Sequence, residues 1–454
     1  MSSVLRFGTY DNLLTAVIFL AIIVTCGLTP MQTDTWWQLR AGQDMWLSRT
    51  VLLSDIYSHT AYGSFWLNHE WLADVVFYGT YRLGGLALLT LLAAALIVGG
   101  WAVTWRLTQG PVESAFMWTA LALVCSAGWW EPRPHAFSLL FLPLTVLLLA
   151  HSRHWWLPAV FLVWANCHGG VLLGFVLLGA GFGVQTLLAP RQWWRFALVM
   201  VACMVAVTLT PLGLLFWTEI PRSLMRINQY TLNEWMRPGF FSELPMIPFW
   251  FIAMTLVGFL ARNGRRLLHL TAAEATVHAC ALALLPGAIL AVRNVGPFVM
   301  VAVPAITWLI SAGRVRVAVA RNERPVLNLA VGLVAAVTVT CTLVWAYSRS
   351  LDRLRWEPVP AGALAALERC PDNLYNRYDE GGPLLWFAQG RKVFLDGRQD
   401  PYPPDLVLEH VRIETGLSGH EQTFARFGIR CAYLPAVSPV ARRLTETGWK
   451  ALYR

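Results

Sequence analysis

Short polar clusters interrupt an otherwise apolar chain, and they hold residue types that transfer protons and bind phosphate. A carboxylate within hydrogen-bond reach of a hydroxyl can take its proton while the hydroxyl attacks. A guanidinium can hold a phosphate group through two parallel hydrogen bonds. The candidates are the carboxylates Asp34, Glu70 and Glu131, the cations Arg40, Arg133 and Arg293, and the imidazoles His69, His135 and His168.

These candidates belong to six clusters, which also contain Asn166, Glu234, Trp36 and Trp37 as substrate-binding candidates. The clusters are Asp34 with Arg40, NHEW at 68–71, EPRPH at 131–135, NCHGG at 166–170, NEWMRP at 233–238 and RN at 293–294. Packed in a helical bundle, they predict one polar cavity. Structural interpretations stay open: the indoles can anchor at a membrane interface, Glu131 can pair with Arg133, and His168 can be a satisfied histidine at a tight helix contact.

The composition indicates that membrane helices must position these residues. The chain has 454 residues, of which 56% are hydrophobic and 13% charged, whereas a soluble chain carries about 25% charged residues. Eleven apolar windows approach the length of about 20 residues that crosses a bilayer. They are Asn12–Thr29, Gly85–Trp105, Ala115–Trp130, His135–Ala150, Trp156–Cys167, Gly170–Ala189, Phe196–Trp217, Pro245–Ala261, Ala272–Val292, Val295–Ser311 and Val326–Tyr347.

The distribution of arginine predicts the orientation of the chain. With a cytoplasmic N-terminus, every inside loop is basic, as the positive-inside rule requires. The loops contain Arg106, Arg153, Arg191 and Arg195, then Arg262, Arg265 and Arg266, and finally Arg314, Arg316, Arg321 and Arg324. The six clusters then face the outside. The net charge of +9 is therefore assigned to inside loops, and no nucleic-acid partner is predicted.

Two domains are expected, a transmembrane domain at 1–347 with a long outside loop at 31–84, and an extracytoplasmic domain at 348–454. In this tail, strands alternate with helices, which predicts a small α/β domain with a largely parallel sheet. The expected strands are Asn373–Tyr378, Lys392–Leu395, Cys431–Pro435 and Lys450–Tyr453. Its Cys370 and Cys431 can bridge in an oxidising compartment, with Cα atoms within about 7 Å.

A charged turn follows the second expected strand at Asp396, Arg398 and Asp400. Ligands bind at the carboxyl ends of strands in open α/β sheets, so the turn can be a ligand site. It can also be a salt-bridged lock between Asp396 and Arg398 that docks the tail domain onto the membrane part of the chain, and this second interpretation is favoured. The turn has no Gly-rich phosphate loop beside it.

Seven sequence blocks resemble those of the GT-C superfamily of integral membrane glycosyltransferases, in particular a bacterial branch of it. The blocks are DTWWQLRAGQ, HEWL, RPHAF, NCHGG, NEW, RNVGPF and KVFLDGRQDPY. The resemblance implies a polyprenyl-phosphate-linked sugar donor and a catalytic acidic residue at the start of the first outside loop, here Asp34. Catalytic roles for Glu70 and Glu131 are further expectations. The paired acidic residues common in the superfamily's first loop are missing around Asp34.

The expected function is transfer of a sugar from a polyprenyl-phosphate donor to an acceptor at the outer face of a bacterial inner membrane. Alternatives are a lipid-linked glycan ligase or polymerase, and a non-catalytic transport or assembly protein. The tail lacks the tryptophan-rich acceptor motif of oligosaccharyltransferases, which argues against transfer to asparagine sequons. Partners are the lipid-linked sugar and the bilayer; the acceptor and any cofactor stay unassigned, and no metal site is predicted.

Overall fold

The chain is almost entirely helical in a computed structural model that describes residues 7–227, 233–240, 243–262, 270–311, 323–349, 351–371, 373–417 and 419–454. Its contacts divide it into two compact units. Unit 1 contains Met1–Thr29, Thr90–Thr210 and Leu232–Ser350, and unit 2 contains Pro30–Leu89, Pro211–Thr231 and Leu351–Arg454. The first outside loop thus groups with the tail, and each unit is described in turn.

Every predicted span contains a helix, and eight helices in the described residues are long and apolar enough to cross a membrane. They lie in α1 (Tyr10–Leu28), α3 (Trp71–Leu107), α4 (Val112–Ser126), α7 (Val171–Leu188), α10 (Ile247–Arg262), α11 (Ala272–Leu290), α12 (Val295–Ser311) and α13 (Pro325–Arg349). The other three predicted spans form shorter helices. These are α5 (His135–Ala150), α6 (Leu157–Cys167) and α8 (Trp193–Thr208).

Glycine and proline set two helix boundaries. At Gly84 and Gly85 the backbone of α3 leaves the helical conformation, and Gly85 has φ +63°, which suits a residue without Cβ. The predicted span begins at this kink. The predicted span Phe196–Trp217 is too long: α8 ends at Thr208, and α9 (Leu215–Ile227) is a separate helix. Pro211, which lacks an N–H, and Gly213, with φ +56°, separate the two.

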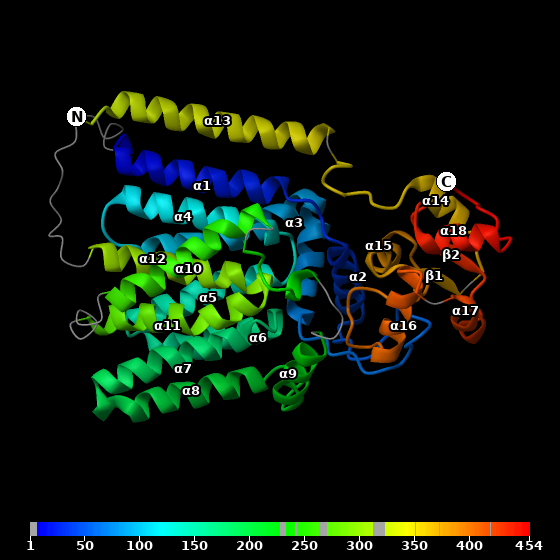
Figure 1. Cartoon of the computed structure of the whole chain (residues 1–454), viewed down its shortest axis with the longest axis horizontal. Helices are drawn as coiled ribbons and strands as arrows, with labels where there is room; N and C mark the ends of the chain where they lie inside the picture. Colours follow the sequence, from blue (N-terminus) through cyan, green and yellow to red (C-terminus); the bar gives the residue numbers. More distant parts are fainter. Residues whose placement is uncertain are drawn as a thin grey trace. The chain divides into compact units, whose positions relative to one another are not determined.

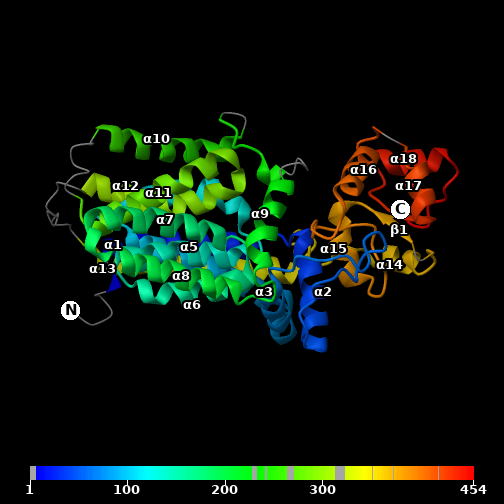
Figure 2. The ribbon, with the colours of Figure 1, turned by 90° about the horizontal axis from the view of Figure 1, so that it is seen from below.

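Unit 1 is a bundle of helices that run side by side (Figure 1), and Figure 2 shows the same bundle from below. α12 packs against α4, α10 and α11, while α5 packs against α6, α7 and α11. Because successive helices reverse direction, the turns before α5, after α6 and before α12 lie at one end of the bundle. The turns that carry Arg106, Arg153 and Arg191 lie at the other end. The polar clusters of unit 1 are thereby segregated from its arginine-rich turns.

Unit 2 has a core to which the first outside loop and the tail both contribute. Trp37 and Met45 from α2 (Thr33–Ser48), together with Tyr57 and Trp66, pack with buried residues of the tail. The tail residues in this core are Leu367, Leu374, Leu384, Leu385, Val393 and Cys431. The tail therefore shares its hydrophobic core with residues more than 300 positions earlier in the sequence.

The tail contains a small parallel sheet, as predicted, but with two strands. β1 (Leu374–Asn376) pairs with β2 (Cys431–Tyr433) in the register Leu374 to Cys431. The helices are α14 (Ala361–Leu367), α15 (Tyr378–Phe387), α16 (Pro404–Glu414), α17 (Glu421–Phe427) and α18 (Pro439–Glu446). The strand expected at Lys392–Leu395 instead makes a single bridge, between Val393 and Ser58 of the first loop. The prediction of a strand at Lys450–Tyr453 is wrong, because this described segment pairs with no strand.

The predicted disulfide between Cys370 and Cys431 is confirmed, with a Cα–Cα distance of 5.6 Å. Cys431 is the first residue of β2, and Cys370 follows α14. The bond therefore ties the start of the tail to its sheet.

Candidate functional site

Asp34 stands in the first turn of α2, where the helix dipole favours a negative charge. Its side chain is half-buried, and the indole Nε1–H of Trp37 donates a hydrogen bond to its Oδ1 at 3.2 Å. Trp36 is 1% exposed and packs against Phe387 of α15, with ring centroids 4.8 Å apart. Both indoles are thus part of the core of unit 2, and Trp37 orients the Asp34 carboxylate.

Gly382 and Gly397 allow the tail to approach the start of α2 closely, and Gly381 allows a close approach within the tail. A Cβ on Gly382 would lie 2.2 Å from the carbonyl oxygen of Thr33, and one on Gly381 would lie 2.4 Å from that of Leu395. A Cβ on Gly397 would lie 1.9 Å from Oδ1 of Asp34. Since Cβ atoms do not approach backbone oxygens so closely, a side chain at position 381 or 382 would displace the backbone, and one at position 397 would displace the Asp34 carboxylate. The charged turn after Leu395 therefore lies directly against the candidate catalytic carboxylate.

This turn, residues 396–400, is held by a buried ion pair. Arg398 donates from Nε and Nη2 to the two carboxylate oxygens of Asp396 at 2.8 and 2.7 Å, and its Nη1 lies 2.7 Å from Oδ1 of Asp55. All three side chains are fully buried. Burial opposes the charge, but Asp396 and Asp55 hold the pKa of the Arg398 guanidinium well above its usual range. The geometry is that of a salt-bridged lock, and it joins the tail to Asp55 of the first loop. The predicted docking onto the membrane part stays a prediction.

The rings around Arg398 complete the lock. Its guanidinium carbon lies 4.9 Å from the ring centroids of both Tyr57 and Trp66, a cation–π arrangement. The Tyr402 hydroxyl donates to Asp396 Oδ2 at 3.0 Å. Asp55 and Tyr57, which the sequence analysis did not single out, come from the first loop. A buried guanidinium requires nearby carboxylates that compensate its charge. The need for a second carboxylate besides Asp396 was the sequence feature that could have pointed to Asp55.

The remaining site residues predicted in unit 2 lie near α2. Gln38, one turn after Asp34, donates to Oε2 of Glu70 at 3.3 Å, so Glu70 contacts the helix that carries Asp34. His69 Nε2 lies 3.6 Å from Oε1 of Glu70. Arg40 is paired with Asp44 at 3.0 Å, which also accepts a hydrogen bond from the Tyr57 hydroxyl at 2.8 Å. Arg40 thus supports the loop in this structure.

In unit 1, three predicted clusters meet around Glu234. Arg293 Nη1 lies 3.2 Å from its Oε1 and Arg133 Nη1 lies 3.6 Å from its Oε2. Burial would raise the pKa of the Glu234 carboxyl, but Arg293 and Arg133 outweigh it and lower the pKa. Arg293 also stacks over the Trp235 ring at 4.4 Å. Two arginines therefore share one ionised carboxylate and are held in place by it.

Glu131 and His135 flank Arg133 in the sequence. Glu131 is 4% exposed, and the His135 ring Nε2 hydrogen-bonds the Trp129 carbonyl. Asn166, another predicted site residue, donates its amide to the Leu162 carbonyl at 2.8 Å within its own helix.

His168 lies in the turn between α6 and α7 and contacts a residue that the sequence analysis missed. Its Nδ1 lies 2.7 Å from the Ser138 hydroxyl, which in turn lies 2.7 Å from Nε1 of Trp164. Ser138 is three residues after His135 on α5, so the two share a helix face. A serine inside a predicted span is a polar group that needs a partner, and this was the signal that could have identified it.

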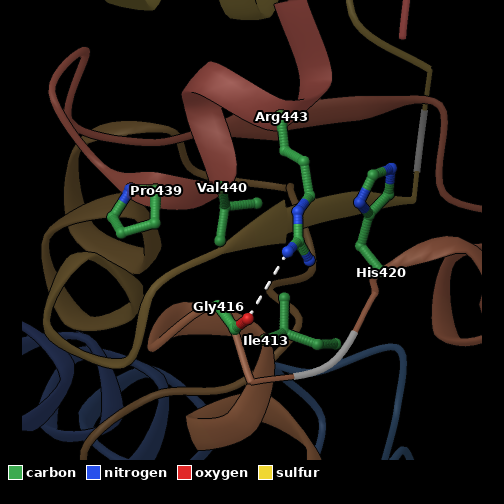
Figure 3. A pocket seen from close by; sticks show the side chains of 6 residues that line it. All are labelled: Ile413, Gly416, His420, Pro439, Val440 and Arg443. Atoms are coloured by element: carbon green, nitrogen blue, oxygen red, sulfur yellow. Dashed lines mark hydrogen bonds between the residues drawn. The ribbon is translucent and has the colours of Figure 1, made fainter. Parts of the chain in front are cut away.

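No metal site adds to these clusters in the part of the chain described here. Its histidine, cysteine and acidic side chains form no group of three that could hold a metal. Figure 3 shows a small pocket of about 40 Å³ in the tail, lined by Ile413, Gly416, His420, Pro439, Val440 and Arg443. Arg443 reaches across it to the Gly416 carbonyl at 3.4 Å. None of the predicted site residues lines this pocket.

Solved structures show which fold this arrangement represents. The chain resembles the *Archaeoglobus fulgidus* oligosaccharyltransferase tethered with an acceptor peptide containing the NVT sequon, with a TM-score of 0.55, 14% identity, and coverage of 86% of this chain and 64% of that one. It also resembles archaeal AglB from *A. fulgidus* in complex with an inhibitory peptide and a dolichol-phosphate, with a TM-score of 0.54, 13% identity, and coverage of 85% and 64%.

The chain thus spans about two thirds of the length of these oligosaccharyltransferases, 64% in each case. ArnT from *Cupriavidus metallidurans* in the apo state gives a TM-score of 0.45 at 14% identity, with 88% of each chain covered. A scan of protein-family models and a search of curated proteins give no match. The chain shares the fold of these archaeal oligosaccharyltransferases, and it is a multi-pass membrane protein.

Proposed function

We propose that this chain is a membrane glycosyltransferase that moves a sugar from a polyprenyl-phosphate-linked donor to an acceptor at the outer face of the membrane. The observation that carries the proposal is the placement of Asp34. It opens the first helix after the first span of a GT-C fold, and Trp37 and Gly397 constrain its carboxylate. A structural neighbour is described in complex with a dolichol-phosphate, which supports a lipid-phosphate donor.

Asp34 is proposed as the general base. The acceptor hydroxyl oxygen bonds to the anomeric carbon of the donor sugar while the bond from that carbon to the phosphate oxygen breaks. The hydroxyl proton passes to the Asp34 carboxylate, and the polyprenyl phosphate leaves with the bonding electrons. Within unit 1, Arg133 and Arg293 are proposed to bind an anionic group, because they outnumber the Glu234 carboxylate that they share.

The test compares Asp34→Asn with the parent chain in a strain that lacks the chromosomal copy. Asn keeps the shape and can still accept the Trp37 hydrogen bond, but it cannot take a proton at neutral pH. Loss of a general base costs about a hundredfold to ten-thousandfold in rate. Thin-layer analysis of lipid-linked sugars should therefore show the donor accumulating as it does in the strain without the chain.

Asp352→Asn is the matched control, because Asp352 is an exposed acid of the same unit. It should restore the parent lipid profile. Size-exclusion chromatography of each purified variant checks that folding is intact. An Asp34→Asn chain that restores the parent profile would remove the catalytic assignment.

A further inference from the structure

Two turns at the arginine-rich end of unit 1 present tryptophans and arginines on the surface. One turn precedes α6 and the other precedes α8. All of these side chains are exposed, and the four indoles are between 50% and 65% exposed. We call this set the basic-aromatic surface; its residues are Arg153, Trp155, Trp156, Arg191, Trp193, Trp194 and Arg195.

The two turns are neighbours within unit 1. α8 packs against α6 and against the turn that precedes α6, and both helices lie beside α7 (Figure 1). The His154 ring lies edge-on to Phe182 of α7 at 5.3 Å and to Phe196 of α8 at 5.4 Å. Because His154 follows Arg153 in the sequence and Phe196 follows Arg195, one aromatic core anchors both turns.

The positive charge of this surface is not compensated by the chain. Segments 151–157 and 189–196 contain no aspartate or glutamate, and no carboxylate of a described residue pairs with the three arginines. α6 and α8 both begin here without an acid in the first turn, whereas α4 and α11 begin at the same end of the bundle with Glu113 and Glu274. Helix N-termini carry partial positive charge, so they add to that of the arginines.

The position of the surface indicates what covers it. α7 is long and apolar enough to cross a membrane and ends at Leu188, three residues before Arg191. Exposed tryptophans at the end of a span lie at the level of the lipid headgroups. Leu187, which is 80% exposed, places an apolar side chain next to this level, where acyl chains begin.

The charge of the surface selects among headgroups. A guanidinium binds a phosphate group through two parallel hydrogen bonds. A zwitterionic headgroup carries its own cation beside the phosphate, whereas an anionic headgroup does not. Basic sites between membrane helices bind anionic headgroups in other proteins. Charge complementarity therefore favours an anionic phospholipid.

We propose that the basic-aromatic surface binds an anionic phospholipid, with the arginines on the phosphate and the indoles beside the glycerol backbone. The surface lies at the end of the bundle away from the polar clusters of unit 1, so this inference does not depend on the proposed function. The lipid supplies the negative charge that the starts of α6 and α8 lack.

The binding test uses the purified full chain in micelles of an uncharged detergent. The probes are phosphatidylglycerol and phosphatidylcholine, each with a fluorescent acyl chain, and fluorescence anisotropy measures the affinity of each. The parent should prefer phosphatidylglycerol. Arg153→Gln and Arg195→Gln should each lower that affinity about fivefold, the usual effect of one basic residue at an anionic membrane surface, and leave the affinity for phosphatidylcholine unchanged.

Arg106→Gln is the matched control, because Arg106 is an exposed arginine at the same end of the bundle but lies outside the surface. It should bind both lipids as the parent does. Trp155→Ala should weaken both lipids to a similar extent, because an indole anchors at the headgroup level whatever the charge there. Size-exclusion chromatography of each variant checks that folding is intact.

Equal affinity of the parent for the two lipids would overturn the proposal. So would a loss of phosphatidylglycerol binding in Arg106→Gln as large as in Arg153→Gln, because the preference would then follow the overall charge of this end of the bundle. Parent-like binding by the double variant Arg153→Gln, Arg195→Gln would also overturn it.

Discussion

At the scale of single residues, the most consequential group is Arg398, because it is charged, fully buried and paired with acids of both the first loop and the tail. Taking charges out of water is costly, and such an arrangement is stable only while every partner is present. Asp396 lies in the same turn, whereas Asp55 lies in the first loop. Arg398 therefore connects these two parts of the chain.

Arg398→Met should destabilise unit 2 strongly. Removing one partner of a buried ion pair costs about 3–5 kcal/mol, because the remaining charges stay buried without compensation. Thermal unfolding of the purified protein measures the loss. The control is Arg426→Met, which breaks an exposed pair with Glu409 in the same unit and should cost less than about 1 kcal/mol. Equal melting temperatures for the two variants would contradict the lock.

Glu380 gives unit 2 a specific pH dependence. Burial, which outweighs the opposing charge of Arg377, raises the pKa of its carboxyl to about 7. The folded state thus holds the proton of Glu380 more tightly than the unfolded state does. The contribution of Glu380 to the free energy of unfolding therefore falls as the pH rises from about 4.5 to about 7. Glu380→Gln should remove that slope and melt higher than the parent above pH 7, with little difference below pH 4.5.

The comparison is made by thermal unfolding of parent and variant at matched pH values, because other carboxylates titrate in the same range and cancel in the difference. Asp405→Asn, at an exposed acid, is the control and should show no such difference. If the difference in melting temperature between Glu380→Gln and the parent were the same at every pH from about 4.5 to about 7, the raised pKa of Glu380 would be contradicted.

At the scale of elements, the disulfide couples α14 to β2 and closes a separation of 61 residues. Chain entropy alone gives a loop of this length roughly 4 kcal/mol. Cys370→Ser should therefore lower the melting temperature of unit 2, and reductant should do the same to the parent. Cys341→Ser, at an exposed free cysteine, should change neither. Insensitivity of the parent to reductant would mean that the bond adds no stability.

The sequence predicted elements best where local composition decides them. Apolar runs identified the helices of the bundle, and Gly85 marked the kink of α3. Composition could not show that Val393 bridges to Ser58, because pairing across that separation depends on the whole fold. The same holds for the shared core, in which Trp66 meets Leu374. Ser138 was missed because a lone serine in an apolar run resembles filler until its partners Trp164 and His168 are known.

At the scale of the whole molecule, the alternation of arginine-rich and polar turns yields a prediction about orientation. Gly419 should be accessible from the extracytoplasmic side of the membrane and Arg265 from the cytoplasmic side. Arg265 is not among the residues that the structure describes. Cysteine substitutions at the two positions, labelled with a membrane-impermeant thiol reagent before and after lysis, measure this. Labelling of both from the same side would contradict the predicted topology.

The shared core of unit 2 cannot form until the tail has been synthesised. Tyr57 and Trp66 leave the ribosome long before the tail that covers them. The roughly 300 residues between Trp66 and Leu367 take about 15 to 60 s to translate at the usual rates. Throughout that interval the first loop presents uncovered aromatic rings and an uncompensated Asp55, so its assembly completes only after the last helix has been inserted. A nascent chain arrested before the tail should expose the first loop to protease, and release of the full chain should protect it.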